Sequence, residues 1–235
     1  MNMSSRLVIA LGIAGCVITA GCDLSAGRMI GFGACISGML LQRMDYSGKF
    51  FPDMQPLNVF VVALIAMLVC AAFGTVTGFF IAYLNVPPFI ATLAMMEIVY
   101  GIGLIVTNAT PLGGYVEQYT NVSNGKFLGI NYLIWIAIIV AAITWFIFNM
   151  TRHGKYMYAI GGNPQAAEVA GVPVKATLIL IYMKAAAMYG LAGFMLGAKA
   201  GGASVNLGYG YEMEAIAACT IGGVSVTGCL LYTSP

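Results

Sequence analysis

Several ionisable side chains stand within or beside apolar stretches of the sequence, where they could take part in chemistry. A charged side chain that faces lipid costs at least ~2.5 kcal/mol, so each of these groups is expected to face a cavity or a polar partner. The acids and a neighbouring serine are candidates for a substrate path or gate, and structural pairs or helix caps are the alternative. The ionisable residues are Asp23, Arg28, Glu97, Lys184, Glu212 and Glu214, and the path candidates are Asp23, Ser25, Glu97, Glu212 and Glu214.

Residue types with catalytic or metal-binding chemistry are few and scattered. The sequence has one histidine, His153, and six cysteines without C-x-x-C spacing. Zinc sites need short, paired spacings of Cys and His, and a nucleophilic enzyme needs a base within reach of its nucleophile. The phosphate-binding pattern GxxxxGK[ST] does not occur. We therefore expect no catalytic residue, no metal and no cofactor, and the chain is not expected to be an enzyme.

The composition identifies the environment of the chain. Of its 235 residues, 60% are hydrophobic and only 8% are charged, whereas a soluble domain carries about 25% charged residues. A water-facing surface could not be covered with so few charges. A formal net charge of +2 without a basic stripe argues against a nucleic-acid partner. The composition predicts an all-α, polytopic transmembrane helix bundle that lies in the lipid bilayer.

Uncharged stretches predict about seven membrane segments, because a spanning helix needs about 20 apolar residues. Two segments near the N-terminus, residues 7–22 and 29–41, extend only about 24 and 20 Å. The polar stretch 23–28 lies between them. A broken helix beside a translocation path is one interpretation, and an interfacial turn in which Asp23 caps a helix is the other. The remaining segments are expected at residues 57–84, 89–106, 132–150 and 177–196 and from Ala215 onward.

Three polar connections between the spans are long enough to bind a partner. Residues 43–53 and 107–126 are rich in Gly, Asn, Tyr and Ser and are expected to form solvent-facing loops. The third connection, residues 151–176, has an excess of basic residues. This excess favours a cytoplasmic position for that loop, whereas the charges of the whole chain do not decide its orientation.

Residues 161–171 predict a short helix that stands clear of the membrane. Asn163 is a good N-cap, Pro164 suits the first helical position, and Gly171 suits the C-terminal stop. A capped helix of two turns between spans indicates that another protein docks there, and a surface helix without a partner is the alternative. The docking residues are expected to be Gly161, Gly162, Asn163, Pro164, Ala166, Ala167 and Gly171, with the alanines, Ala170 included, exposed.

Four runs of residues match the motifs of a known family in the same order. The runs are GCDLSAG at residues 21–27, NVPPFIATL at 85–93, RHGKYMYAIGGNPQAAEVAGV at 152–172, and YEMEAIAA at 211–218 followed by IGG at 221–223. The first resembles the element G-x-D-L-S-x-G, and the last resembles Y-E-L-D-A-I-A-A-x-x-I-G-G. Together they resemble the permease subunits of bacterial ABC sugar importers, the ribose, xylose and galactose group. The likeness is greatest to the galactose and methyl-galactoside permeases.

The resemblance implies a subunit that forms the translocation path and couples to a separate ATPase. Members of the family pair as two permeases, bind two ATP-hydrolysing subunits on the cytoplasmic side, and receive sugar from a periplasmic binding protein. For this chain it implies three partners, namely an ABC ATP-binding subunit, a periplasmic sugar-binding protein and a second permease copy. It also implies a multi-pass location in the bacterial inner membrane, with residues 161–171 as a coupling helix in a groove of the ATPase.

Some features of the sequence depart from the family pattern. Lys184 stands where small, uncharged residues are expected, and an ion pair with Glu97 would accommodate it. The family has about ten spans, so residues 1–228 are expected to form a single, incomplete permease domain with its coupling loop at 151–176. Residues 229–235 are expected to be a non-native tail. An ion-coupled secondary transporter remains the alternative function, because it would also use broken helices and buried acids.

Overall fold

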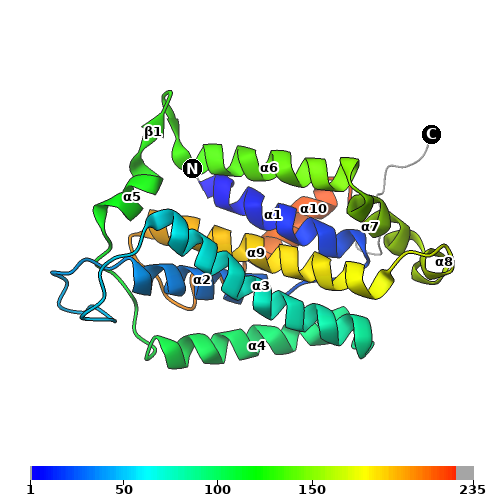
Figure 1. The fold of residues 1–235 in the computed structure, drawn as a ribbon, viewed down its shortest axis with the longest axis horizontal. Coiled ribbons are helices and arrows are strands. Elements are labelled where there is room, and N and C mark those ends of the chain that lie inside the picture. The colour runs from blue at the N-terminus through cyan, green and yellow to red at the C-terminus, as the bar shows by residue number, and fades with distance from the viewer. Residues whose placement is uncertain (1, 226–235) are drawn as a thin grey trace.

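The protein is a bundle of helices that run side by side along one axis (Figure 1). The structure is a computed structural model and describes residues 2–225, so the tail expected at 229–235 lies outside the described residues. The predicted all-α class is confirmed. The helices are α1 (Asn2–Ile18), α2 (Ala26–Leu40), α3 (Val59–Tyr83), α4 (Pro88–Val106), α5 (Glu117–Asn124), α6 (Tyr132–Met150), α7 (Arg152–Gly162), α8 (Pro164–Val169), α9 (Val174–Ala200) and α10 (Tyr211–Ile221), and the strands are β1 (Lys126–Phe127) and β2 (Ile130–Asn131).

Among the described residues, four helices are long and apolar enough to span a membrane, namely α3, α4, α6 and α9. They lie where the uncharged stretches placed them. Asn85, in the left-handed region at φ 51°, turns the chain between α3 and α4, and Pro88 occupies the first turn of α4, where its missing N–H is not needed. The predicted segment from Ala215 differs, because α10 already begins at Tyr211, after Gly210 with φ 89°.

Helix α9 is the centre of the bundle, and it packs against α1, α2 and α3. Small residues bring these helices close together. A Cβ on Gly74 of α3 would overlap with Ala186 of α9, and a Cβ on Gly193 of α9 would overlap with the carbonyl oxygen of Ile30 in α2. Close approach of this kind is how helices associate in lipid, where no hydrophobic force drives them together. The glycines therefore determine the spacing of the core helices.

The Gly193→Ala variant is expected to be strongly destabilised. Its Cβ would lie 2.8 Å from the backbone nitrogen of Ala34, and overpacking of this kind costs about 1–3 kcal/mol or more. Gly101→Ala in α4 is the matched control, because no atom outside the neighbouring backbone of α4 lies within 4 Å of the added Cβ; this variant should be neutral or stabilised by up to about 1 kcal/mol. Thermal unfolding in detergent measures both. A Gly193→Ala variant with wild-type Tm would contradict the packing described for α2 and α9.

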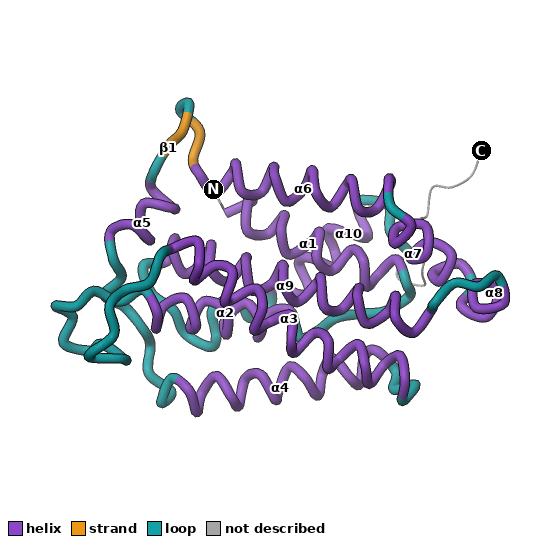
Figure 2. Tube along the Cα trace, viewed as in Figure 1, coloured by secondary structure: helices purple, strands orange, loops and turns teal. Residues whose placement is uncertain are grey.

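Short elements gather at the two ends of the bundle, as Figure 2 shows. At one end lie α5 and the hairpin of β1 and β2, and at the other lie α7 and α8 (Figure 1). The expectation that residues 107–126 form only a loop is wrong, because α5 forms there. Tyr119 of α5 is fully buried, and its hydroxyl donates to the carbonyl oxygen of Phe194 at 2.7 Å. This contact with α9 stabilises a helix in a segment whose composition favours a loop.

Candidate functional site

No helix forms between the end of α1 and the start of α2, and this connecting segment lies inside the bundle. Asp23 and Ser25 are both buried. The Oδ1 atom of Asp23 accepts hydrogen bonds from the backbone nitrogen of Ser25 at 3.0 Å and from its Oγ at 2.6 Å. Because the carboxylate lies before the first turn of α2, it also faces the positive end of the helix dipole. The turn is therefore buried among the helices, and Asp23 orders the start of α2.

A second non-helical segment precedes α10 and packs against the start of α2. A Cβ on Gly27 would lie 2.8 Å from the carbonyl oxygen of Gly208 and would overlap with the carboxylate of Glu212. Glu212 is only 6% exposed, and its Oε1 accepts from the backbone nitrogen of Gly210 at 3.2 Å. Its Oε2 is buried without a hydrogen-bond partner among the described residues. The N-termini of α2 and α10 thus lie side by side, with Asp23 and Glu212 near them.

An arginine at the start of α2 contacts the non-helical segment that precedes α10. The guanidinium carbon of Arg28, in α2, lies 3.9 Å from the ring centroid of Tyr100 and 4.5 Å from that of Tyr209. Its Nη1 donates to Oδ1 of Asn206 at 2.5 Å. Gly208, with φ 100°, lets the chain turn so that the side chains on both sides of it reach Arg28. We call Arg28, Tyr100, Asn206 and Tyr209 the arginine cluster; cation–π contacts of this kind contribute about 0.5–2 kcal/mol each.

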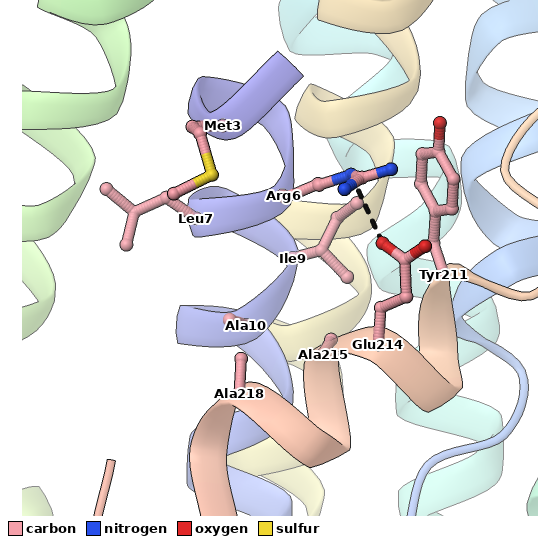
Figure 3. A pocket seen from close by; sticks show the side chains of 9 residues that line it. All are labelled: Met3, Arg6, Leu7, Ile9, Ala10, Tyr211, Glu214, Ala215 and Ala218. Carbon is pink, nitrogen blue, oxygen red and sulfur yellow. Dashed lines mark ion pairs between the residues drawn. The ribbon is translucent and has the colours of Figure 1, made fainter. Parts of the chain in front are cut away.

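Glu214 lies one half-turn beyond Glu212 and has a different environment. Its Oε2 is 3.1 Å from Nε of Arg6 in α1, and both side chains are about half exposed. Figure 3 shows this ion pair beside a pocket of about 300 Å³ between α1 and α10, and the guanidinium carbon of Arg6 lies 5.2 Å from the ring centroid of Tyr211. The pair joins α1 to α10. Glu214 therefore forms a structural ion pair, which was the alternative to a role in the substrate path.

The expected ion pair between Lys184 and Glu97 does not form. Glu97 is exposed on α4 and has no ion pair within the described part of the chain. Lys184 instead lies beside α1, α6 and α7, whereas α4 packs against α2 and α3. Glu97 precedes Tyr100 by three positions, so it shares the helix face that carries the arginine cluster.

No sequence pattern predicted that the four residues of the arginine cluster lie together. Arg28 stood out as a charge beside an apolar stretch, but Tyr100, Asn206 and Tyr209 carry no spacing that relates them to it. The only local sign was the glycine-rich run around Asn206 and Tyr209. Within residues 2–225, no three His, Cys, Asp or Glu side chains are placed to hold a metal ion.

The capped helix expected after the span α6 is present as α8. Asn163 Oδ1 accepts from the backbone nitrogen of Ala166 at 3.0 Å, Pro164 begins the helix, and Gly171 has φ 84°. The helix stands beyond the ends of the spanning helices (Figure 1). It is shorter than the predicted two turns. Gly161 and Gly162 belong to the end of α7, a helix that was not predicted.

The exposed face of α8 also differs from the prediction. Ala166 and Ala170 are exposed as expected, but Ala167 is only 4% exposed. Its burial follows from the packing of α8 on α7 and α9, which the local sequence does not reveal. Val169 is instead 91% exposed, although it is apolar. A rigid helix outside the spans therefore presents small and apolar side chains to its surroundings.

Comparison with known proteins places these features in a family. Residues 2–233 match the family described as branched-chain amino acid transport system / permease component. The chain belongs to this permease family. Its spanning helices are thus those of a transporter subunit in the inner membrane, and not those of an enzyme. No solved structure matches the chain.

Three curated proteins similar to this chain are import permeases. The galactose/methyl galactoside import permease protein MglC of Escherichia coli strain K12 is 43% identical over 96% of this chain and 69% of its own length. The protein of the same name from Haemophilus influenzae is 44% identical with the same coverage. The ribose import permease protein RbsC of Escherichia coli strain K12 is 31% identical over 96% of this chain and 68% of its own length.

Proposed function

We propose that this chain is the transmembrane permease subunit of an ATP-driven importer of galactose, methyl galactosides or a related monosaccharide. The similarity to import permeases for these sugars supports the substrate class. The proposed coupling to ATP hydrolysis rests on one observation, namely that α8 is a capped helix that stands clear of the spanning helices. The sequence contains no phosphate-binding loop, so the ATPase site belongs to a separate subunit.

Helix α8 and its flanking residues are the coupling element in this proposal. Closure of an ATPase dimer has to displace a rigid element if it is to reopen a membrane path. Asn163 and Gly171 determine where α8 begins and ends, and α8 packs on α7 and α9. A displacement of α8 is therefore passed to α9, the central helix of the bundle. Val169 and Ala166 form the surface that contacts the ATPase subunit.

The arginine cluster marks the translocation path. Arg28 is partly exposed, and Asn206 and Tyr209 are exposed, at the depth where α2 and α10 begin. Lipid would not tolerate these side chains. We infer that a second copy of the permease covers this face and that the path runs between the two copies. Amide and guanidinium groups can hydrogen-bond sugar hydroxyls, and the tyrosine rings can contact the apolar face of a sugar.

The acids and Ser25 contribute to this path in different ways. Asp23, Ser25 and Glu212 hold the two helix starts in position, and Glu97 shares a helix face with Tyr100 of the cluster. The end with α5 and the hairpin receives sugar from a periplasmic binding protein. We propose that residues 1–228 form one permease domain, in which residues 151–176 are the coupling loop on the cytoplasmic side.

Reconstitution in liposomes tests the proposed function. The permease, its ATPase subunit and the sugar-binding protein are expected to accumulate labelled galactose only with ATP, and a protonophore should leave the uptake unchanged. Liposomes that lack the ATPase subunit are the control. Uptake that proceeds without the ATPase and collapses with the proton gradient would establish an ion-coupled secondary transporter instead.

A further inference from the structure

We propose that the crevice between α1, α6, α7 and α9 binds the phosphate group of an anionic phospholipid of the cytoplasmic leaflet, through Lys184 and His153. The crevice shares no lining residue with the arginine cluster and is not part of the transport path proposed above. The proposal rests on the proposed function in one respect only, namely that the end of the bundle with α7 and α8 is cytoplasmic.

The residues that line the crevice suit a lipid. Lys184 of α9 and His153 of α7 are the titratable groups that line it. The other lining residues are uncharged, and most are apolar, including Ile147, Phe148 and Met188. Walls of this kind can contact an acyl chain, while the two basic side chains remain for the headgroup. The lining thus combines the two chemistries of a phospholipid in one place.

The charge in the crevice has no counter-ion within the chain. Lys184 is half-buried and forms no ion pair among residues 2–225. Burial, and then the charge of Lys184, lower the pKa of His153 to about 4. His153 is therefore neutral near pH 7, and Lys184 supplies the positive charge. The Nε2 atom of His153 is buried without a hydrogen-bond partner in the described structure, so its hydrogen-bonding capacity is unused.

The position of the crevice favours a lipid over a soluble anion. Lys184 stands ten positions after Val174, where α9 begins, which corresponds to about 15 Å along the helix. His153 is the third residue after Met150, where the spanning helix α6 ends, which favours a position at the boundary between membrane and water. A lysine inside a span extends its side chain toward that boundary. Basic crevices between spanning helices on the cytoplasmic side bind anionic headgroups.

Neighbouring charges strengthen the attraction for an anion. Arg152 and Lys155, in the first turn of α7, form no ion pairs within the described residues. Both lie close to His153 in the sequence, and both side chains are exposed. The acid on the adjacent helix, Glu168, is exposed on α8 and does not line the crevice. The surroundings of the crevice are therefore basic.

Lipid-dependent stability tests the proposal. The purified permease is placed in nanodiscs of phosphatidylcholine alone or with one third phosphatidylglycerol, and Tm is measured. We expect phosphatidylglycerol to raise the Tm of the wild type and of Lys184→Arg, and to leave that of Lys184→Met unchanged. Lys199→Met is the matched control, because Lys199 is a partly buried lysine at the other end of the same helix; it should keep the full shift.

Co-purified lipid provides a second measurement. Wild-type protein should retain at least threefold more phosphatidylglycerol through purification than Lys184→Met. If Lys184→Met does not fold, His153→Leu, which keeps the lysine, should retain less lipid than the wild type. Inorganic phosphate alone should not shift Tm, and a shift equal to that with the lipid would identify a free-anion site and overturn the proposal. Equal shifts in Lys184→Met and wild type would overturn it also. Neither measurement involves sugar or ATP, so a failure of the transport assay leaves this test valid.

Discussion

The Val169→Asp variant is expected to lower ATP-driven sugar uptake at least tenfold and to abolish co-purification with the ATPase subunit. Val169 is 91% exposed on α8, so its replacement leaves the fold of the permease intact. In a docked complex the same side chain would be buried against the ATPase, and an unpaired carboxylate in an interface costs several kcal/mol. Uptake in membrane vesicles and co-purification in detergent measure the two effects.

Two further variants show whether the effect belongs to the docking surface. Leu128→Asp is the matched control, because Leu128 is an aliphatic residue that is 78% exposed in the hairpin at the opposite end of the bundle. It should retain the ATPase subunit fully. Ala167→Trp should instead reduce the yield of folded permease, since Ala167 is buried. Wild-type co-purification and uptake with Val169→Asp would refute the coupling role of α8.

Replacement of Arg28 by methionine is expected to lower uptake at least tenfold while the complex still assembles. The variant loses both cation–π contacts and the charged hydrogen bond to Asn206, and a hydrogen bond to a charged group contributes about 1.5–3 kcal/mol. The segment that carries Tyr209 then loses its link to α2, and the path loses a hydrogen-bond donor. Uptake and ATPase co-purification, measured on the same membranes, separate transport from assembly.

Tyr209 provides the control for this prediction. Its ring contacts Arg28, so Tyr209→Phe should transport nearly as well as the wild type, whereas Tyr209→Ala should lose most of its uptake. If Arg28→Met and Tyr209→Ala both transported at the wild-type rate, the arginine cluster would not be part of the path. A loss of assembly in Arg28→Met alone would assign the cluster to structure instead.

Hydropathy located the spanning helices well because the bilayer imposes a length and a composition on each of them. The predicted segments 132–150 and 89–106 agree with α6 and α4 to within about one residue. Helix α8 was also predictable, because Asn163, Pro164 and Gly171 act on the backbone within a few positions of themselves. These features depend on local interactions and are therefore readable from a short stretch of sequence.

Burial and long-range contacts were not predictable in the same way. Ala167 and Ala166 are the same residue type, yet one is buried and the other exposed because of the helices that pack nearby. The hydrogen bond between Arg28 and Asn206 joins residues 178 positions apart. Lys184 was expected to meet Glu97, but it lies beside His153 instead. No periodicity encodes such pairs.

The sequence by itself determined that this protein is a helical membrane protein, where most of its spans lie, and where a capped helix forms between two of them. Those properties follow from hydrophobicity and from capping residues that act on their own neighbourhood. The tertiary structure decided that the helices α2 and α10 begin at one place, that Arg28 joins them, and which face of α8 is free. Such relations arise only when distant segments pack together, because each side chain then acquires its environment from residues that are not its neighbours in the sequence.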